Sequence, residues 1–387
     1  AIEYHQSGRL EEAEYIYQEI LKVSPDNIDA LHLLGILAYG LKEYEAACDL
    51  IKKAVQLSPG YAEAHYNLGK VYQEQGRLDD AIASYGRAIA VNPGYAEAHN
   101  NLGNAFIGQG RLDEAIASYG RAIDANPDDA YSYCNFGNAL REQGRLDDAI
   151  ASYRHAITLN PGYSKARNSL AHTLQEQGKV DEAINEYRCA LEIDPDNSIA
   201  AHMLAALAGQ TTETAPPIYV RTLFDYCAKR FEDQLVKKLE YRSPTLLRQV
   251  LDGLIKDGHR FENAIDLGCG TGLSGMAFRP IISRLTGIDI SRNMIEEAGR
   301  KGIYDCLHVG DIHDFLCKTD ERYDLFIATD VLVYIGNLLP IFSSVRDSSI
   351  SGAYFVFLTE SMDSTSSPGG KDYLLRQTGR YAHSLAY

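Results

Sequence analysis

The sequence predicts an all-α repeat domain followed by an α/β domain with a doubly wound sheet. Three observations lead to this prediction. A 34-residue pattern recurs through the first half of the chain, it stops near Ala208, and short apolar runs then alternate with helix-like stretches. A chain of 387 residues also exceeds the size that one hydrophobic core commonly serves. We therefore expect two domains.

The composition argues against some partners before any motif is considered. With 53 acidic against 37 basic residues, the formal charge is −16. Nucleic acids and anionic membranes attract positive charge, so we expect neither as a partner. The seven cysteines are scattered without CxxC spacing, as reduced intracellular thiols are, and we expect the protein to be cytoplasmic. The repeat histidines lie 34 or more residues apart and predict no metal site.

The repeated pattern indicates pairs of packed helices. Five full copies run from 28 to 197, half a copy precedes them, and a capping helix is expected near Ser198–Ala208. Glycine or alanine recurs where two helices cross closely, and a proline stops each second helix because it has no N–H. The turns between helices carry a glycine, which suits a left-handed backbone: Gly76, Gly110, Gly144 and Gly178.

These repeats resemble the tetratricopeptide family over residues 1–209. The resemblance implies a superhelix whose concave face binds a peptide or protein segment. Asparagines recur there at 34-residue intervals, similar to the asparagine ladder of protein O-GlcNAc transferases, and their amides can pair with a peptide backbone. The expected peptide-binding residues are Asn67, Asn101, Asn135, Asn104, Asn138 and Lys70. An inert scaffold or a self-association surface is the alternative, because duplication alone copies asparagine into each repeat.

The second domain is expected at 218–387, after a linker at 210–217 that is rich in threonine and proline. Helical segments are expected around Tyr219–Leu239 and Pro244–Lys256. Alternating strands and helices predict a parallel, doubly wound sheet. The predicted strands are 263–268, 284–290, 306–312, 323–332 and 353–361.

A glycine-rich loop follows the first predicted strand, in the sequence Asp266-Leu-Gly-Cys-Gly-Thr-Gly272. Such a loop brings the backbone close to a nucleotide ligand at the start of a helix. A dinucleotide fingerprint would need glycine at 273, where Leu273 stands. Asp266 would repel a pyrophosphate but suits the cationic groups of S-adenosylmethionine. We expect this cofactor to contact Asp266, Gly268, Cys269, Gly270 and Gly272.

The next strand ends supply further cofactor candidates. Asp289 ends the second strand and can accept hydrogen bonds from both ribose hydroxyls, although enzymes that bind NAD share this feature. Asp311 ends the third strand and can accept from the adenine amino group, or simply cap a helix. The adenine ring is expected to pack against Ile290, Ile312 and Met294.

Together these motifs resemble class I S-adenosylmethionine-dependent methyltransferases, and the whole chain resembles predicted tetratricopeptide-containing methyltransferases. The resemblance implies methyl transfer to an unidentified small molecule or protein, with S-adenosylhomocysteine as product. It places Thr329 where cofactor and acceptor meet, and Tyr226 and Phe231 on a segment that covers the cofactor. The catalytic candidates are Asp330, Tyr334 and His383.

The sequence also departs from this family. A helix is expected to start near Tyr373, and the two last strands of the family's fold would follow it, so the Rossmann-like sheet is expected to be truncated at Tyr387. The alternative function is therefore an interaction scaffold whose second domain binds S-adenosylmethionine without catalysis.

Overall fold

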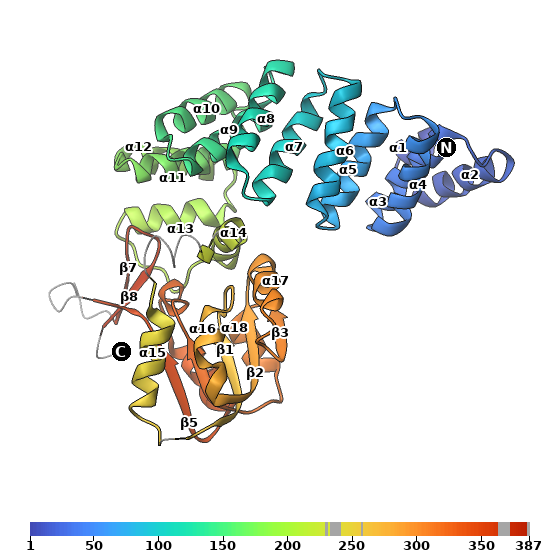
Figure 1. The fold of residues 1–387 in the computed structure, drawn as a ribbon. Helices are drawn as coiled ribbons and strands as arrows, with labels where there is room; N and C mark the ends of the chain where they lie inside the picture. Colours follow the sequence, from blue (N-terminus) through green and yellow to red (C-terminus); the bar gives the residue numbers. More distant parts are fainter. Residues whose placement is uncertain (229–230, 233–240, 257, 363–371, 385–387) are drawn as a thin grey trace. The chain divides into compact units, whose positions relative to one another are not determined.

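The computed structural model describes residues 1–228, 231–232, 241–256, 258–362 and 372–384 (Figure 1). The chain divides into two compact units, Ala1–Gly178 and Lys179–Tyr387. The predicted boundary at residue 209 stays a prediction, because the last two repeat-type helices fall in the second unit. No helix in the described ranges is both long and apolar enough to cross a bilayer.

The first unit consists of helices that follow one another as the repeat pattern predicts, from blue to green in Figure 1. They are α1 Ile2–Gln6, α2 Leu10–Val23, α3 Ile28–Gly40, α4 Tyr44–Leu57, α5 Ala62–Glu74, α6 Leu78–Val91, α7 Ala96–Gly108, α8 Leu112–Ala125, α9 Ala130–Glu142, α10 Leu146–Leu159 and α11 Ser164–Glu176.

Repeated small and aromatic residues lock each helix pair together. A Cβ added at Gly69 would lie 2.5 Å from the ring of Tyr85, and one at Gly103 would lie 2.6 Å from Tyr119. Both tyrosines are buried, so the glycine makes room for a ring that fills the space between two helices. The predicted close crossings are therefore present in the folded chain.

The second unit begins with α12 Val180–Ile193 and α13 Ser198–Leu207 and continues into the α/β domain. Its further helices are α14 Pro217–Cys227, α15 Ser243–Asp252, α16 Leu273–Phe278, α17 Arg292–Arg300, α18 Ile312–Lys318 and α19 Leu339–Asp347, with 3₁₀ turns η3 Arg279–Ile281 and η4 Leu332–Tyr334. Helix α13 lies where the sequence predicts a capping helix.

The main sheet is parallel, as the α/β alternation predicts, with strand order β3-β2-β1-β4-β5. The strands are β1 Phe261–Leu267, β2 Ile282–Asp289, β3 Cys306–Val309, β4 Tyr323–Ala328 and β5 Ser349–Phe357. The strand order reverses between β1 and β4, and ligands of such sheets bind at the carboxyl ends of the strands near this reversal.

The segment after β5 corrects one prediction. No helix starts near Tyr373; instead β7 Tyr373–Leu375 pairs antiparallel with β8 Tyr381–His383, and β6 Glu360–Ser361 completes a small sheet. The turn between them has Gly379 at φ 78°, and Gly379 N–H donates to the Arg376 carbonyl over 2.9 Å. A glycine at this left-handed position favours a hairpin over a continuing helix.

The predicted linker is an ordered part of the second unit. Its backbone pairs with the loop after η4: the Glu213 carbonyl accepts from Gly336 N–H over 2.9 Å, and Ala215 N–H donates to the Tyr334 carbonyl over 3.0 Å. Ala215 is buried beside this loop. The chain between repeats and sheet thus folds onto the carboxyl side of β4.

Candidate cofactor-binding site

The glycine loop after β1 has the backbone that its sequence predicts. Gly268, Gly270 and Gly272 have φ of 68°, 53° and 93°, all in the region that favours glycine. A Cβ on Gly268 would lie 2.5 Å from the side chain of Val331. The amides of Gly268 and Cys269 both donate to the Ile288 carbonyl, which fastens the loop to β2.

Asp266 lies fully buried at the end of β1. Its Oδ2 accepts hydrogen bonds from Ser274 Oγ over 2.7 Å and from Tyr304 Oη over 2.6 Å. Its Oδ1 has no hydrogen-bond partner of normal geometry among the described residues. Burial raises the pKa of this carboxyl to about 6, although both hydroxyl donors oppose the shift.

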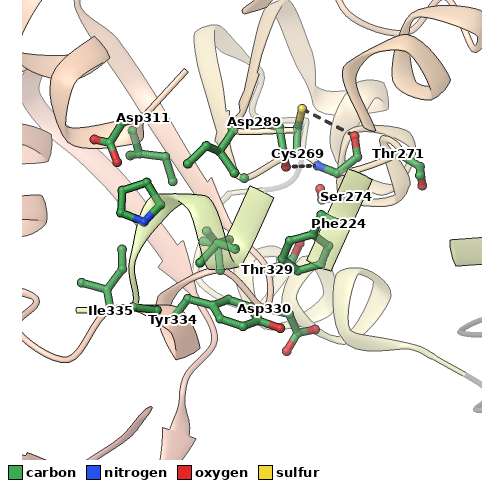
Figure 2. A pocket seen from close by; sticks show the side chains of 18 of the residues that line it. Phe224, Cys269, Thr271, Ser274, Asp289, Asp311, Thr329, Asp330, Tyr334 and Ile335 are labelled. Atoms are coloured by element: carbon green, nitrogen blue, oxygen red, sulfur yellow. Dashed lines mark hydrogen bonds between the residues drawn. The ribbon is translucent and has the colours of Figure 1, made fainter. Parts of the chain in front are cut away.

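Asp289 joins the loop to the end of β2. Its Oδ2 accepts from Gly270 N–H over 2.9 Å, the contact drawn as a dashed line in Figure 2, and its Oδ1 accepts from Ser291 N–H over 2.8 Å. Burial raises the pKa of this carboxyl to about 6 as well. Each oxygen retains a second lone pair, so the carboxylate can accept from a ligand hydroxyl.

A cavity of about 480 Å³ lies over these strand ends. Figure 2 shows Asp289 and Cys269 on one side of it and Asp330 with Tyr334 on the other. The predicted site residues that line it are Gly268, Cys269, Gly270, Asp289, Ile290, Asp311, Ile312, Phe231, Thr329, Asp330 and Tyr334. The side formed by Gly268, Gly270 and Asp289 is the glycine-loop end of the cavity.

The opposite side, called the acceptor end, is formed by Asp330, Tyr334, Tyr241, Phe224 and Arg380. Asp330 follows β4 by two residues. It is a non-glycine residue with φ 55°, which is a strained backbone conformation. Tyr241 Oη donates to Asp330 Oδ2 over 2.5 Å, and Arg380 Nη2 lies 3.9 Å from Asp330 Oδ1. The rings of Phe224 and Tyr334 meet edge to face at 5.4 Å.

Family models agree with both halves of this architecture. Models described as tetratricopeptide repeat match residues 26–93, 66–130, 118–151 and 140–208, and a model described as methyltransferase domain matches residues 264–347. The chain is a tetratricopeptide–methyltransferase fusion. A methyltransferase domain generally implies S-adenosylmethionine as the methyl donor.

The curated relatives match only short stretches of this fusion. Human tetratricopeptide repeat protein 7A is 36% identical over 75 residues, 19% of this chain and 9% of that protein. The UDP-N-acetylglucosamine–peptide N-acetylglucosaminyltransferase of Caenorhabditis elegans is 36% identical over 76 residues, 20% of this chain and 7% of that protein. The fusion therefore spans less than a tenth of the length of these relatives.

Solved repeat structures also resemble part of the fusion. A crystal structure of MamA is 28% identical with a TM-score of 0.40, covering 43% of this chain and 96% of MamA. A crystal structure of YrrB is 22% identical with a TM-score of 0.42, covering 48% of this chain and 96% of YrrB.

Some predicted residues of the methyltransferase domain lie outside the cavity. Asp266 is fully buried behind the loop, Met294 is buried in α17, and Gly272 is the N-cap of α16; none of the three is among the described lining residues. Asp311 lines the cavity and also caps α18, since its Oδ1 accepts from Asp314 N–H over 3.0 Å. The side chain of Tyr226 lies outside the described residues.

The structure argues against His383 as a catalytic base. His383 is buried in β8 and is not among the described lining residues. Its Nε2 lies 2.9 Å from the Ile335 carbonyl, and its Nδ1 lies 2.5 Å from Thr359 Oγ1. Burial lowers the pKa of this imidazole, so the neutral ring donates through Nε2 and accepts at Nδ1. Both nitrogens are committed to structure.

In the repeat arm, the predicted peptide-binding side chains are partly exposed and already bonded to neighbours. Asn101 Nδ2 donates to Tyr66 Oη over 3.0 Å, and Asn135 Nδ2 donates to Asn100 Oδ1 over 3.1 Å. Asn67 Nδ2 lies 2.9 Å from His32 Nε2. The side-chain oxygens of Asn104 and Asn138 accept hydrogen bonds from the hydroxyls of Tyr119 and Tyr153, respectively. Lys70 Nζ lies 4.8 Å from the centre of the Tyr39 ring. Each amide still has further hydrogen-bonding capacity.

Sequence reasoning missed Tyr241, Phe224 and the linker residues Thr214 and Ala215, which all line the cavity. No local motif marks them, because they reach the cavity through the fold. The aromatic content of the 219–241 region was the signal that could have raised Phe224 and Tyr241 as candidates.

Proposed function

We propose that this protein is a cytoplasmic S-adenosylmethionine-dependent methyltransferase that acts on an unidentified small molecule or protein, and that its repeat arm binds a protein segment. The arrangement of Asp289 carries the proposal. This buried carboxylate is fixed by a glycine-loop amide and lines a cavity at the strand-order reversal. That is where an open α/β sheet binds a nucleoside.

The residues at the glycine-loop end fit this cofactor. Asp289 can accept from the ribose hydroxyls, while Ile290 and Ile312 provide apolar surface for an adenine ring. Asp266 is fully buried and is not among the described lining residues; through Ser274 Oγ, which its Oδ2 accepts from, it supports the wall of the cavity from behind the loop. The buried carboxylate of Asp289 lines this end of the cavity and disfavours a pyrophosphate, and the cationic lining residue Arg380 lies at the acceptor end.

When bound, S-adenosylmethionine supplies a methyl group on a sulfonium leaving group, so positioning of the acceptor contributes much of the catalysis. Asp330 is the catalytic candidate that the acceptor end retains. Tyr241 donates to one of its oxygens, and Arg380 faces the other. Asp330 can take a proton from an acceptor that must lose one, and Tyr334 adds an aromatic wall.

The first test is calorimetry of S-adenosylhomocysteine binding to the full chain. We expect wild type to bind and Asp289→Asn to lose at least about tenfold in affinity, because a charged hydrogen-bond acceptor is replaced by an amide. Asp347→Asn is the matched control, since Asp347 is exposed on α19 and pairs only locally with Arg346. Absence of binding by wild type would contradict the proposal.

The inert-scaffold alternative requires a second measurement. Radiolabelled methyl transfer from S-adenosylmethionine to material captured on the full chain distinguishes catalysis from binding alone. A double variant, Asn101→Ala with Asn135→Ala, is expected to reduce both capture and labelling, because two partly exposed amides are removed from the arm. Unchanged capture would argue against the asparagine ladder as the binding surface.

A further inference from the structure

The terminal repeat-type helix α13 is anchored to the C-terminal hairpin of the methyltransferase domain. His202 Nε2 lies 3.1 Å from the Gly379 carbonyl, across 177 positions of sequence, and His202 is buried. Burial lowers the pKa of this imidazole, so the neutral ring donates to that carbonyl. Both partners belong to the same compact unit.

Gly379 is fitted closely against α13 and α14. It has φ 78°, and an added Cβ would lie 2.7 Å from Tyr219 Oη and 3.1 Å from Met203 Sδ. Thr212 Oγ1 lies 2.5 Å from Tyr381 Oη, which ties the linker to the same hairpin. The position of the hairpin turn therefore depends on α13, the linker and α14 together.

The residue after this glycine is Arg380, which lines the acceptor end of the cavity. Its guanidinium lies 3.9 Å from Asp330 Oδ1, 3.0 Å from Glu360 Oε1 and 5.9 Å from the centre of the Tyr334 ring. The His202 ring contacts the carbonyl of Gly379, and Arg380 is the next residue in the chain. The contact with His202 therefore helps to fix the backbone that carries the Arg380 side chain to the cavity.

We propose that α13 determines the geometry of the acceptor end through His202. In this proposal His202 and Gly379 position Arg380, and Arg380 determines the charge selectivity of the cavity beside Asp330. This inference rests on the proposed function of the cavity. The guanidinium offsets the Asp330 carboxylate, so it limits the attraction of that carboxylate for a cationic group next to the methyl donor. A repeat-type helix thereby contributes to specificity rather than only closing the array.

Two probes separate the ends of the cavity in the full chain. S-adenosylhomocysteine tests the glycine-loop end, and sinefungin, which carries an amine at the position of the transferable methyl, also tests the acceptor end. The measured quantity is the ratio of their dissociation constants at pH 7.5. Arg380→Met is expected to favour sinefungin by about twofold to fivefold, the size typical of a half-exposed charge pair.

His202→Ala is expected to shift the ratio in the same direction by a smaller factor, whereas His202→Gln keeps an N–H donor and restores the wild-type ratio. His99→Ala is the matched control, because His99 is also buried with Nε2 3.0 Å from a backbone carbonyl, that of Pro93 in the repeat arm. In an Arg380→Met background, His202→Ala should add no further shift, since it acts through Arg380.

Hydrogen exchange gives an independent readout of the hairpin. The Arg376 amide, which donates to the Arg380 carbonyl over 2.8 Å, should exchange faster in His202→Ala but not in His99→Ala. Equal weakening of both probes by His202→Ala, an opposite shift, or additivity with Arg380→Met would overturn the inference. If the variants bind S-adenosylhomocysteine normally and the ratio of the two dissociation constants is unchanged, the inference is overturned and the proposed function stands. If wild type binds neither probe, the proposed function is overturned.

Discussion

At the scale of single residues, two carboxyls are costly to ionise: Asp289 at the glycine-loop end of the cavity, and Asp266, which is buried behind the loop. Burial raises the pKa of Asp266 and of Asp289 to about 6, well above the ordinary value of an aspartate. Burial favours the neutral form of both carboxyls, whereas the ionised form of Asp289 is the stronger acceptor for a ligand hydroxyl. Cofactor binding should therefore be linked to proton release near pH 6.

We expect the affinity for S-adenosylmethionine to rise between pH 5 and pH 7, by about tenfold for each carboxylate that must ionise. Calorimetry at several pH values measures this slope, and Asp289→Asn should reduce it. The folding stability of the protein without cofactor should change with pH in the opposite direction to the affinity. Because both pKa values are raised in the folded state, their contribution to stability is present below pH 4 and is lost as the pH rises through about 6. Affinity that is independent of pH would contradict this linkage.

The buried position of His383 leads to a second residue-scale prediction. His383→Ala should lower the stability of the methyltransferase domain by about 1–3 kcal/mol, because it leaves buried carbonyls without a donor. Affinity for S-adenosylhomocysteine should change less than twofold, since His383 does not line the cavity among the described residues. Urea unfolding and calorimetry measure the two quantities, with exposed His259→Ala as control.

At the scale of elements, the repeat arm depends on glycines that admit an aromatic ring. Gly69→Ala should destabilise the arm by about 1–3 kcal/mol, because its Cβ would lie 2.5 Å from the buried Tyr85 ring. Gly86→Ala in the next helix is the matched control: nothing lies within 4 Å of its Cβ, so better helix propensity should stabilise by about 0.5–1 kcal/mol. Thermal unfolding followed by circular dichroism measures both, and equal effects would contradict the packing argument.

Elements also show where sequence patterns are sufficient. The helix pairs and the five parallel strands follow from local periodicity, turn glycines and helix-stopping prolines, so they could be predicted one segment at a time. The hairpin at Tyr373–His383 could not, because β7 and β8 have three residues each and their apolar pattern is too short to separate a strand from a helix.

At the scale of the whole molecule, the candidate site also has one part that local sequence patterns predict and one part that they do not. Asp266, Asp289 and the glycine loop were predicted because they share one short motif and two adjacent strand ends. Tyr241 reaches Asp330 across 89 positions, and His202 reaches Gly379 across 177. Contacts over such separations depend on how distant segments pack, which no local pattern encodes.

The sequence by itself determined the repeat arm, the parallel α/β domain and the glycine-loop end of the cavity, because helix and strand periodicity and turn conformation follow from local residue patterns. Only the tertiary structure decided the acceptor end. Packing in the second unit buries His383 away from the cavity, brings Arg380 beside Asp330, and makes the linker part of the cavity wall. These outcomes depend on close packing between segments that are remote in sequence, where position is set by the neighbours that fill the remaining space.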